Sequence, residues 1–139
     1  MARSQPDAPT VMVVDDTAVV RIVLRMQLTI LGYRVLEARN GAEAVELGRR
    51  ERPDLILMDI GMPVLDGLEA ARLLRDAPET KDIPIVALTA FSDPDTYARA
   101  LEAGCREFAA KPIEMNDLGE MIARNLPPGG RGIRGATKN

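Results

Sequence analysis

The sequence predicts a single α/β domain in which helices cover both faces of one parallel β-sheet. Strand-like and helix-like segments alternate five times between the first apolar run and residue 126. Only 3% of the residues are aromatic, so the core must be built from Val, Ile, Leu, Met and Ala, the composition of buried parallel strands. Right-handed connections between such strands place helices on the two faces of the sheet.

The first three strand–helix pairs follow directly from the hydrophobic pattern. We expect strands at residues 11–15, 33–38 and 54–59, and helices at residues 17–31, 41–51 and 68–76. Gly32 ends the first helix as a C′ residue, and Asn40 with Gly41 turns the chain into the second. Pro53 precedes the third strand, which has the most buried pattern of the five.

The last two pairs have clear boundaries. The apolar run of residues 83–89 is the fourth strand, and Ser92 with Pro94 is typical of a helix start. This helix ends before Gly104. A short strand at residues 107–110 and a helix at 116–126 complete the sheet, and Gly119 weakens that helix.

The ends of the chain differ from its middle. We expect a folded domain at residues 10–126 after a polar tail at 1–9. Residues 127–139 hold too few large apolar side chains to pack, which predicts a disordered tail or the stub of a linker. An Arg/Gly-type nucleic-acid tail is the weaker interpretation, since this segment has only three charges.

Charge and residue usage exclude several classes of function. The net charge is −3, and because the last eleven residues carry three basic residues and no acid, the preceding 128 carry −6. Such a domain is not expected to bind nucleic acid directly. The absence of histidine excludes His-based triads, most zinc sites and a phosphohistidine within the chain.

Cys105 is the only cysteine, which excludes an internal disulfide and fits a reducing cytoplasm. No base for activating this thiol is evident, so we interpret it as structural. The opening segment lacks the apolar stretch of a signal peptide, and no run approaches the roughly 20 apolar residues of a membrane span. We therefore expect a cytoplasmic protein without a membrane partner.

Polar side chains stand where the predicted strands end. Asp15 and Asp16 follow the first strand, Asp59 ends the third, Thr89 ends the fourth and Lys111 follows the fifth. The carboxyl ends of parallel strands share one edge of the sheet, which is where ligands bind in open α/β folds. Crowded carboxylates need a compensating cation to remain ionised, and their hard oxygen atoms suit Mg²⁺.

With these residues the chain resembles the receiver domain of a two-component response regulator of the chemotaxis type. The resemblance covers residues 10 to 126 and rests on four features in order: tandem acids, the aspartate before Gly-Met-Pro, Thr-Ala and Lys-Pro. It implies a flavodoxin-like fold with strand order 2-1-3-4-5. It also implies that Asp59 accepts a phosphoryl group from a histidine kinase or a histidine phosphotransfer protein.

The resemblance further implies the composition of the site. Asp16 and Asp59 would bind Mg²⁺ (or Mn²⁺) directly, Asp15 through water, and Gly61 through its backbone carbonyl. The ion would neutralise the carboxylates so that Asp59 can attack phosphorus. Lys111 would pair with Asp59 and then with the phosphoryl oxygens, beside the hydroxyl of Thr89, and its bond to Pro112 would be cis.

Phosphorylation adds nearly two negative charges at one point, and the resemblance implies a switch built on Thr89 and an aromatic residue. Phe108 matches that aromatic position, although a plain core role is a serious competitor. Gly61 and Phe91 occupy positions that control water near the phosphoryl group in receivers. We hypothesise that the bulky Phe91 prolongs the phosphorylated state.

The first predicted helix carries an apolar stripe outside its expected core positions, which are Val20, Val23, Leu24, Leu28 and Leu31. The stripe consists of Val19, Ile22, Met26 and Ile30. Because receivers dock the donor bundle on this helix, we expect the stripe to contact the histidine-bearing partner. Burial of the stripe by neighbouring elements is an equally weighted alternative.

Two other functions compete with the receiver interpretation. A haloacid-dehalogenase-type phosphohydrolase also uses an aspartate, a lysine and Mg²⁺, but its spaced acid pattern differs from the adjacent pair Asp15 and Asp16. The other is an interaction module with the receiver fold that works without phosphorylation. Taken singly, Asp16 could be a helix cap, Thr89 a strand residue and Lys111 part of a turn. Their coincidence at one edge favours the receiver.

Overall fold

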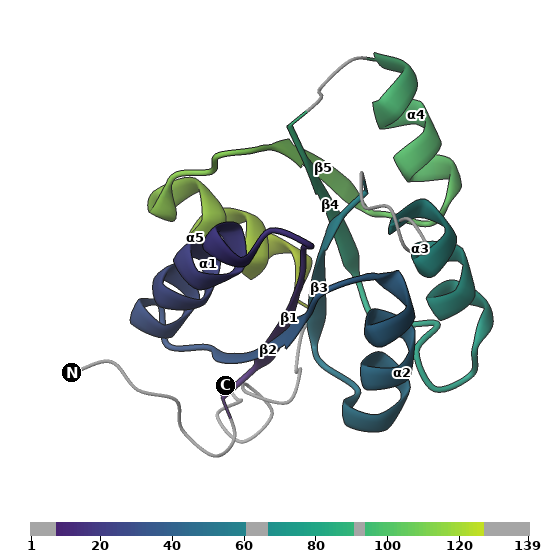
Figure 1. The fold of residues 1–139 in the computed structure, drawn as a ribbon, viewed down its shortest axis with the longest axis horizontal. Helices are drawn as coiled ribbons and strands as arrows, with labels where there is room; N and C mark the ends of the chain where they lie inside the picture. The colour runs from purple at the N-terminus through teal and green to yellow at the C-terminus, as the bar shows by residue number, and fades with distance from the viewer. Residues whose placement is uncertain (1–7, 61–66, 91–93, 127–139) are drawn as a thin grey trace.

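The computed structural model describes residues 8–60, 67–90 and 94–126, and it shows five parallel strands in one sheet (Figure 1). The strand order is β2-β1-β3-β4-β5, which confirms the predicted fold class and topology. The strands are β1 (Thr10–Val14), β2 (Arg34–Ala38), β3 (Leu55–Asp59), β4 (Ile85–Thr89) and β5 (Glu107–Ala110). The two central pairs keep the carboxyl ends level, with Val14 opposite Met58 and Asp59 opposite Leu88.

Helices follow each strand, and none of their predicted boundaries differs by more than two residues from those observed. They are α1 (Ala18–Ile30), α2 (Gly41–Glu51), α3 (Gly67–Asp76), α4 (Pro94–Glu102) and α5 (Met115–Asn125). Figure 1 shows α1 and α5 on one face of the sheet and α2, α3 and α4 on the other. No helix in the described ranges is long and apolar enough to span a membrane.

Alternation along the strands builds two separate cores. On β3, Leu55 and Leu57 pack in the cluster that contains Leu24 and Leu28 of α1, whereas Met58 packs in the cluster beneath α3. This is the pattern expected of strands buried on both faces. The sheet is therefore fixed from both sides, and the side chains at its carboxyl edge are held in register.

Two of the core positions predicted on α1 are wrong. Leu24 and Leu28 are buried as expected, but Val23 is 48% exposed and Leu31 is 36% exposed. The buried residues Leu24 and Leu28 are four residues apart and define the face of the helix that packs on the sheet. Val23 lies at the margin of this face and remains partly open to solvent. Leu31 is the C-cap residue of α1, directly before the turn at Gly32, where the end of the helix leaves it more open to solvent.

Two glycines end helices in the left-handed region. Gly32 has φ +99° after α1, as predicted, and Gly104 has φ +109° after α4. The amide after Gly32, that of Tyr33, returns to the carbonyl of Leu28 at 3.0 Å. Glycine adopts this conformation without the steric cost that a Cβ would add. Each turn sends the chain directly into the next strand.

Gly67 approaches the backbone at the end of β3 so closely that a side chain cannot fit. A Cβ at this position would lie 2.3 Å from the carbonyl oxygen of Asp59. We therefore expect Gly67→Ala to lower the free energy of unfolding by about 1–3 kcal/mol, measured by urea denaturation. Gly119→Ala is the control, since its Cβ would only touch Leu31, and it should add about 0.5–1 kcal/mol. Equal effects of the two variants would contradict this prediction.

The single thiol should be inert in the folded protein. Cys105 is 4% exposed, and burial raises its pKa to about 11. Folding thus favours the protonated thiol, and this contribution to stability is fully present below the pKa of the unfolded thiol. It decreases as the pH rises toward 11. We expect no reaction with a thiol-specific chromogenic reagent at pH 8 and full reaction in denaturant; rapid reaction of the native protein would refute the burial.

Candidate functional site

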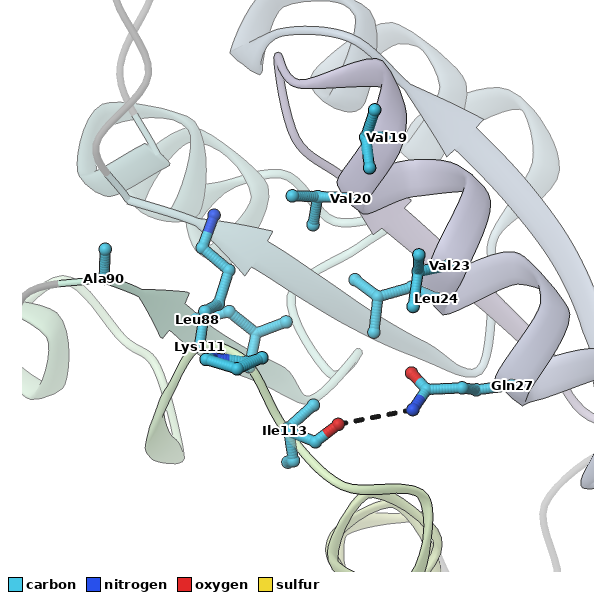
Figure 2. Close-up of a pocket in the computed structure, with 10 residues that line it drawn as sticks. Val19, Val20, Val23, Leu24, Gln27, Leu88, Ala90, Lys111 and Ile113 are labelled. Carbon is cyan, nitrogen blue, oxygen red and sulfur yellow. Dashed lines mark hydrogen bonds between the residues drawn. The ribbon is translucent and has the colours of Figure 1, made fainter.

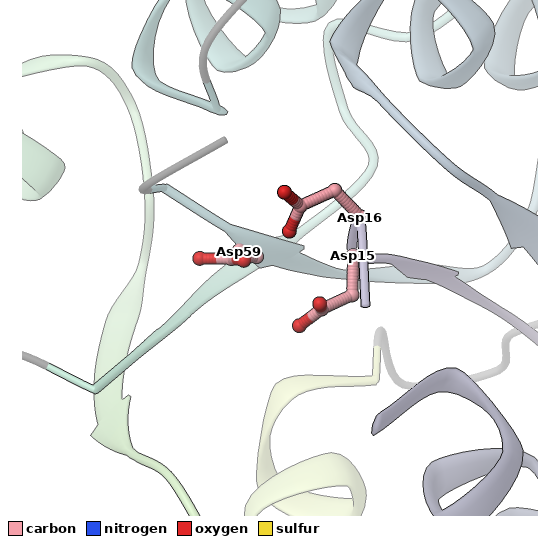
Figure 3. A group of neighbouring side chains, drawn as sticks. All are labelled: Asp15, Asp16 and Asp59. Atoms are coloured by element: carbon pink, nitrogen blue, oxygen red, sulfur yellow. The ribbon is translucent and has the colours of Figure 1, made fainter. Parts of the chain in front are cut away.

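Three carboxylates meet at the carboxyl edge of the sheet (Figure 3). Asp15 and Asp16 follow β1, and Asp59 is the last residue of the neighbouring strand β3. One oxygen atom from each side chain lies within 4.8 Å of the others. Asp15 and Asp59 are buried, at 1% and 7% exposure, whereas Asp16 is exposed. The structure thus brings together the acids expected from the sequence, with one open to solvent.

Lys111, directly after β5, supplies the compensating positive charge. Its Nζ lies 2.8 Å from Asp15 Oδ2 and 3.4 Å from Asp59 Oδ2. Burial alone would lower the pKa of this ammonium, but the hydrogen bond to Asp15 and the two carboxylate charges raise it above its usual value. The expected pair with Asp59 is present, and Asp15 is a second and closer partner that the sequence did not indicate.

Asp15 also holds the chain between β1 and α1. Its Oδ1 accepts a hydrogen bond from the backbone amide of Thr17 at 2.9 Å. The helix-cap role that we considered for Asp16 is not observed, because Thr17 is the N-cap residue of α1 and no side chain among the described residues caps this helix. Asp16, exposed beside it, directs its carboxylate toward the end of β3 (Figure 3).

Thr89 and Phe108 lie toward the face of the sheet that α2, α3 and α4 cover, opposite to the face covered by α1 (Figure 1). Phe108 is paired in register with Ala87, two residues before Thr89, and packs on the core beneath α3 and α4. Its ring contacts that of Tyr97 on α4 edge to face, with centroids 5.5 Å apart and an interplanar angle of 86°. Thr89 is 2% exposed, and its carbonyl accepts the Lys111 amide at 2.8 Å. Of the two residues proposed for switching, Thr89 thus lies next to the site and Phe108 contacts α4.

The remaining site predictions have different outcomes. The bond between Lys111 and Pro112 is cis. Gly61 and Phe91, expected to complete the metal site and to control water, lie outside the described residues, as does Ser92.

An apolar groove of about 420 Å³ lies beside the site, between α1 and the segment after β5 (Figure 2). Val19, Val20 and Val23 line one wall, and Pro112 and Ile113 line the other. Gln27 Nε2 donates to the Ile113 carbonyl at 3.3 Å. Among the described residues, Gln27 Oε1 is the only buried side-chain oxygen or nitrogen atom without a hydrogen-bond partner. Lys111 lines this groove and also binds the acids.

Sequence reasoning missed two neighbours of the site. Arg21 was not predicted to be near the site, yet its Nη1 donates to the backbone carbonyl of Asp15 at 2.7 Å. Tyr97 was not connected to Phe108, because their contact depends on how α4 packs on β5. The only sequence signal for this contact was that Arg21 is a polar residue on a largely apolar helix.

Comparison with known proteins gives consistent results. A family model described as the response regulator receiver domain matches residues 11–123. The polar-differentiation response regulator DivK of Brucella anthropi is 40% identical over 117 residues, covering 84% of this chain and 95% of DivK.

Solved structures agree with this assignment. The chemotaxis protein CheY4 of Vibrio cholerae superposes with a TM-score of 0.82 at 29% identity, covering 86% of this chain and 99% of that one. The receiver domain of a Pseudomonas aeruginosa sensor histidine kinase, whose structure has a magnesium ion coordinated in the active site cleft, gives a TM-score of 0.80 at 36% identity. It covers 85% of this chain and 97% of that chain.

The family match favours the receiver interpretation over the phosphohydrolase. The sheet topology brings the three acids and the lysine together at one edge, as a phosphoacceptor site requires. The chain belongs to the response regulator receiver domain family, and it is a phosphoacceptor signalling domain and not an enzyme with a separate substrate.

Proposed function

We propose that Asp59 accepts a phosphoryl group from the phosphohistidine of a kinase or phosphotransfer protein in a Mg²⁺-dependent reaction, and that the face formed by α4, β5 and α5 responds. The observation that carries this proposal is the convergence of three carboxylates and Lys111 at one sheet edge. No other group of three or more potential metal-ligating side chains was found in the described ranges.

The donor set fits a small hard cation. All three acids offer oxygen atoms, which Mg²⁺ prefers, and the exposed Asp16 leaves access from solvent. Asp16 and Asp59 would hold the ion, while Asp15, already bound to Lys111 and Thr17, would contribute through water. When bound, the ion would neutralise the carboxylates and stabilise charge on the incoming phosphoryl oxygens. The magnesium in the Pseudomonas receiver supports this assignment.

The transfer itself requires little covalent chemistry from the protein. An oxygen of Asp59 forms the new bond to phosphorus as the bond from phosphorus to the donor's histidine nitrogen breaks, and both electrons of that bond leave with the imidazole. Lys111, 3.4 Å from Asp59, offsets the negative charge that accumulates there. The Thr89 hydroxyl would then bind a phosphoryl oxygen, since Thr89 ends the strand beside β3.

The conformational change on phosphorylation would involve the residues on the α4 side of the sheet. Movement of Thr89 toward the phosphoryl group would open space near Phe108, and Phe108 already contacts Tyr97. Since Phe108 has no hydroxyl group, its position depends on packing alone. The roles of Gly61 in metal binding and of Phe91 in prolonging the phosphorylated state stay predictions.

The partner would dock on α1. Val19, Ile22, Met26 and Ile30 are between 44% and 68% exposed, which gives the stripe the accessibility that a contact site needs. The groove beside it continues to Lys111, so a helical bundle that brings a phosphohistidine to Asp59 must pass over it. A cytoplasmic location follows from such a partner.

Phosphorylation is tested by intact mass after incubation with a small-molecule phosphodonor. We expect one phosphoryl adduct that requires Mg²⁺ and is abolished in Asp59→Asn, because the amide is not a nucleophile. Asp54→Asn, a carboxylate outside the site that accepts the Thr10 amide, is the control and should retain the adduct. A folded wild-type protein without an adduct would favour the phosphorylation-independent module or strict dependence on a kinase.

Docking on α1 is tested with Ile22→Glu. A charge in the stripe should slow phosphotransfer from a histidine donor by about tenfold or more, while phosphorylation by a small phosphodonor is unchanged. Leu101→Glu on α4 is the matched control, because the two side chains are similarly exposed, at 44% and 41%. Equal loss with both phosphodonors would indicate damage to the fold, and unchanged transfer would refute docking at this position.

A further inference from the structure

Four polar atoms of Asp15 each have a partner of their own. Its backbone amide donates to Ala38 at 3.1 Å, and its carboxylate accepts from Thr17 at 2.9 Å and from Lys111 at 2.8 Å. The fourth atom, its backbone carbonyl oxygen, accepts from Arg21 Nη1 at 2.7 Å. Of these four contacts, only the one to Arg21 acts on the peptide group that leads into Asp16.

Arg21 is itself held in place. Its side chain is 14% exposed, and its Nε lies 3.4 Å from Glu37 Oε1 on β2. Glu37 also accepts from Arg25 Nη1 at 2.9 Å, one turn further along α1. A guanidinium fixed at one end by a carboxylate can orient the carbonyl at its other end, because its donors lie in one rigid plane.

The carbonyl of Asp15 belongs to the same rigid peptide group as the amide of Asp16. Its orientation therefore sets the direction in which the Asp16 backbone, and then its carboxylate, leaves β1. Asp16 is exposed, whereas Asp15 is 1% exposed, so within the described residues packing constrains Asp16 less than Asp15. The backbone leading into Asp16 is therefore a constraint that matters for this prospective metal ligand.

We propose that Arg21, oriented by Glu37, is a positioning residue that fixes Asp16 for binding Mg²⁺. This inference rests on the proposed metal-dependent function and extends it to a residue that contacts neither the ion nor the phosphoryl group. Groups that orient metal ligands in this way commonly influence metal affinity strongly.

Whether removal of Arg21 weakens or strengthens Mg²⁺ binding distinguishes a positioning role from an effect of its positive charge. Arg21 is cationic, so its removal should strengthen Mg²⁺ binding if its charge alone matters. If it positions Asp16, removal should weaken binding despite the lost repulsion. Arg25 supplies the matched control, since it shares the helix and the partner Glu37 but, in the described part of the chain, has no hydrogen bond to Asp15.

The experiment is a MgCl₂ titration of the ¹⁵N-labelled, unphosphorylated protein, followed by the backbone amide shifts of Asp16 and Asp59. We expect the dissociation constant of Arg21→Met to rise by about three- to tenfold. That of Arg25→Met should stay within about twofold of wild type, because charge screening limits long-range effects. Arg21→Lys, which keeps a donor and the charge, should recover part of the affinity.

Several outcomes would overturn the inference. It fails if Arg21→Met binds Mg²⁺ as tightly as Arg25→Met, or more tightly. The same spectra report folding, and urea denaturation of each variant separates lost affinity from lost stability. Should Arg21→Met not fold, Glu37→Gln releases the guanidinium without changing α1, and unchanged affinity in that variant would count against the inference. Absence of any Mg²⁺-dependent shift in the wild type would instead refute the metal site, and with it this inference.

Discussion

Lys111 lies between two buried carboxylates that would otherwise repel one another. Its ammonium reaches Asp15 and Asp59, which come from the ends of two paired strands, while Lys111 itself follows the edge strand β5. Without it, two buried carboxylates would face one another with no compensating positive charge, which is costly in a site removed from water. The charge balance thus depends on a sheet register that keeps three strand ends level.

In the proposed function, the phosphodonor approaches beside α1 and the response begins on the side of α4. Asp15, Lys111 and the groove beside α1 lie toward the face where a donor would approach. Thr89, Phe108 and Tyr97 lie toward α4, where a response would be displayed. Asp59, at the end of the central strand β3, connects the two faces. Since α5 lies on the same side of the sheet as α1, only the α4 part of the proposed response surface is on the side away from the docking helix (Figure 1).

The sequence was sufficient for the fold because strong signals coincide in it. Buried strands such as β3 read as continuous apolar runs, and glycines such as Gly32 mark helix ends by their backbone geometry. The acids could be placed together because parallel strands end at one edge. Contacts between helices and strands were harder to predict from the sequence. Periodicity cannot tell which side of a helix a neighbour covers, so Val23 was misplaced, and the bond from Arg21 to a backbone carbonyl carries no sequence pattern.

The hydrogen bonds of Asp15 have a consequence for its chemistry as a side chain. Both of its carboxylate oxygens face donors, the Thr17 amide and the Lys111 ammonium. An asparagine of the same shape would have to turn its NH₂ group toward one of them, opposing two donors in a buried site. The position thus requires a group that only accepts hydrogen bonds. Replacement by asparagine should therefore destabilise the fold at Asp15 more than at Asp16, because the exposed Asp16 can leave an NH₂ group in water.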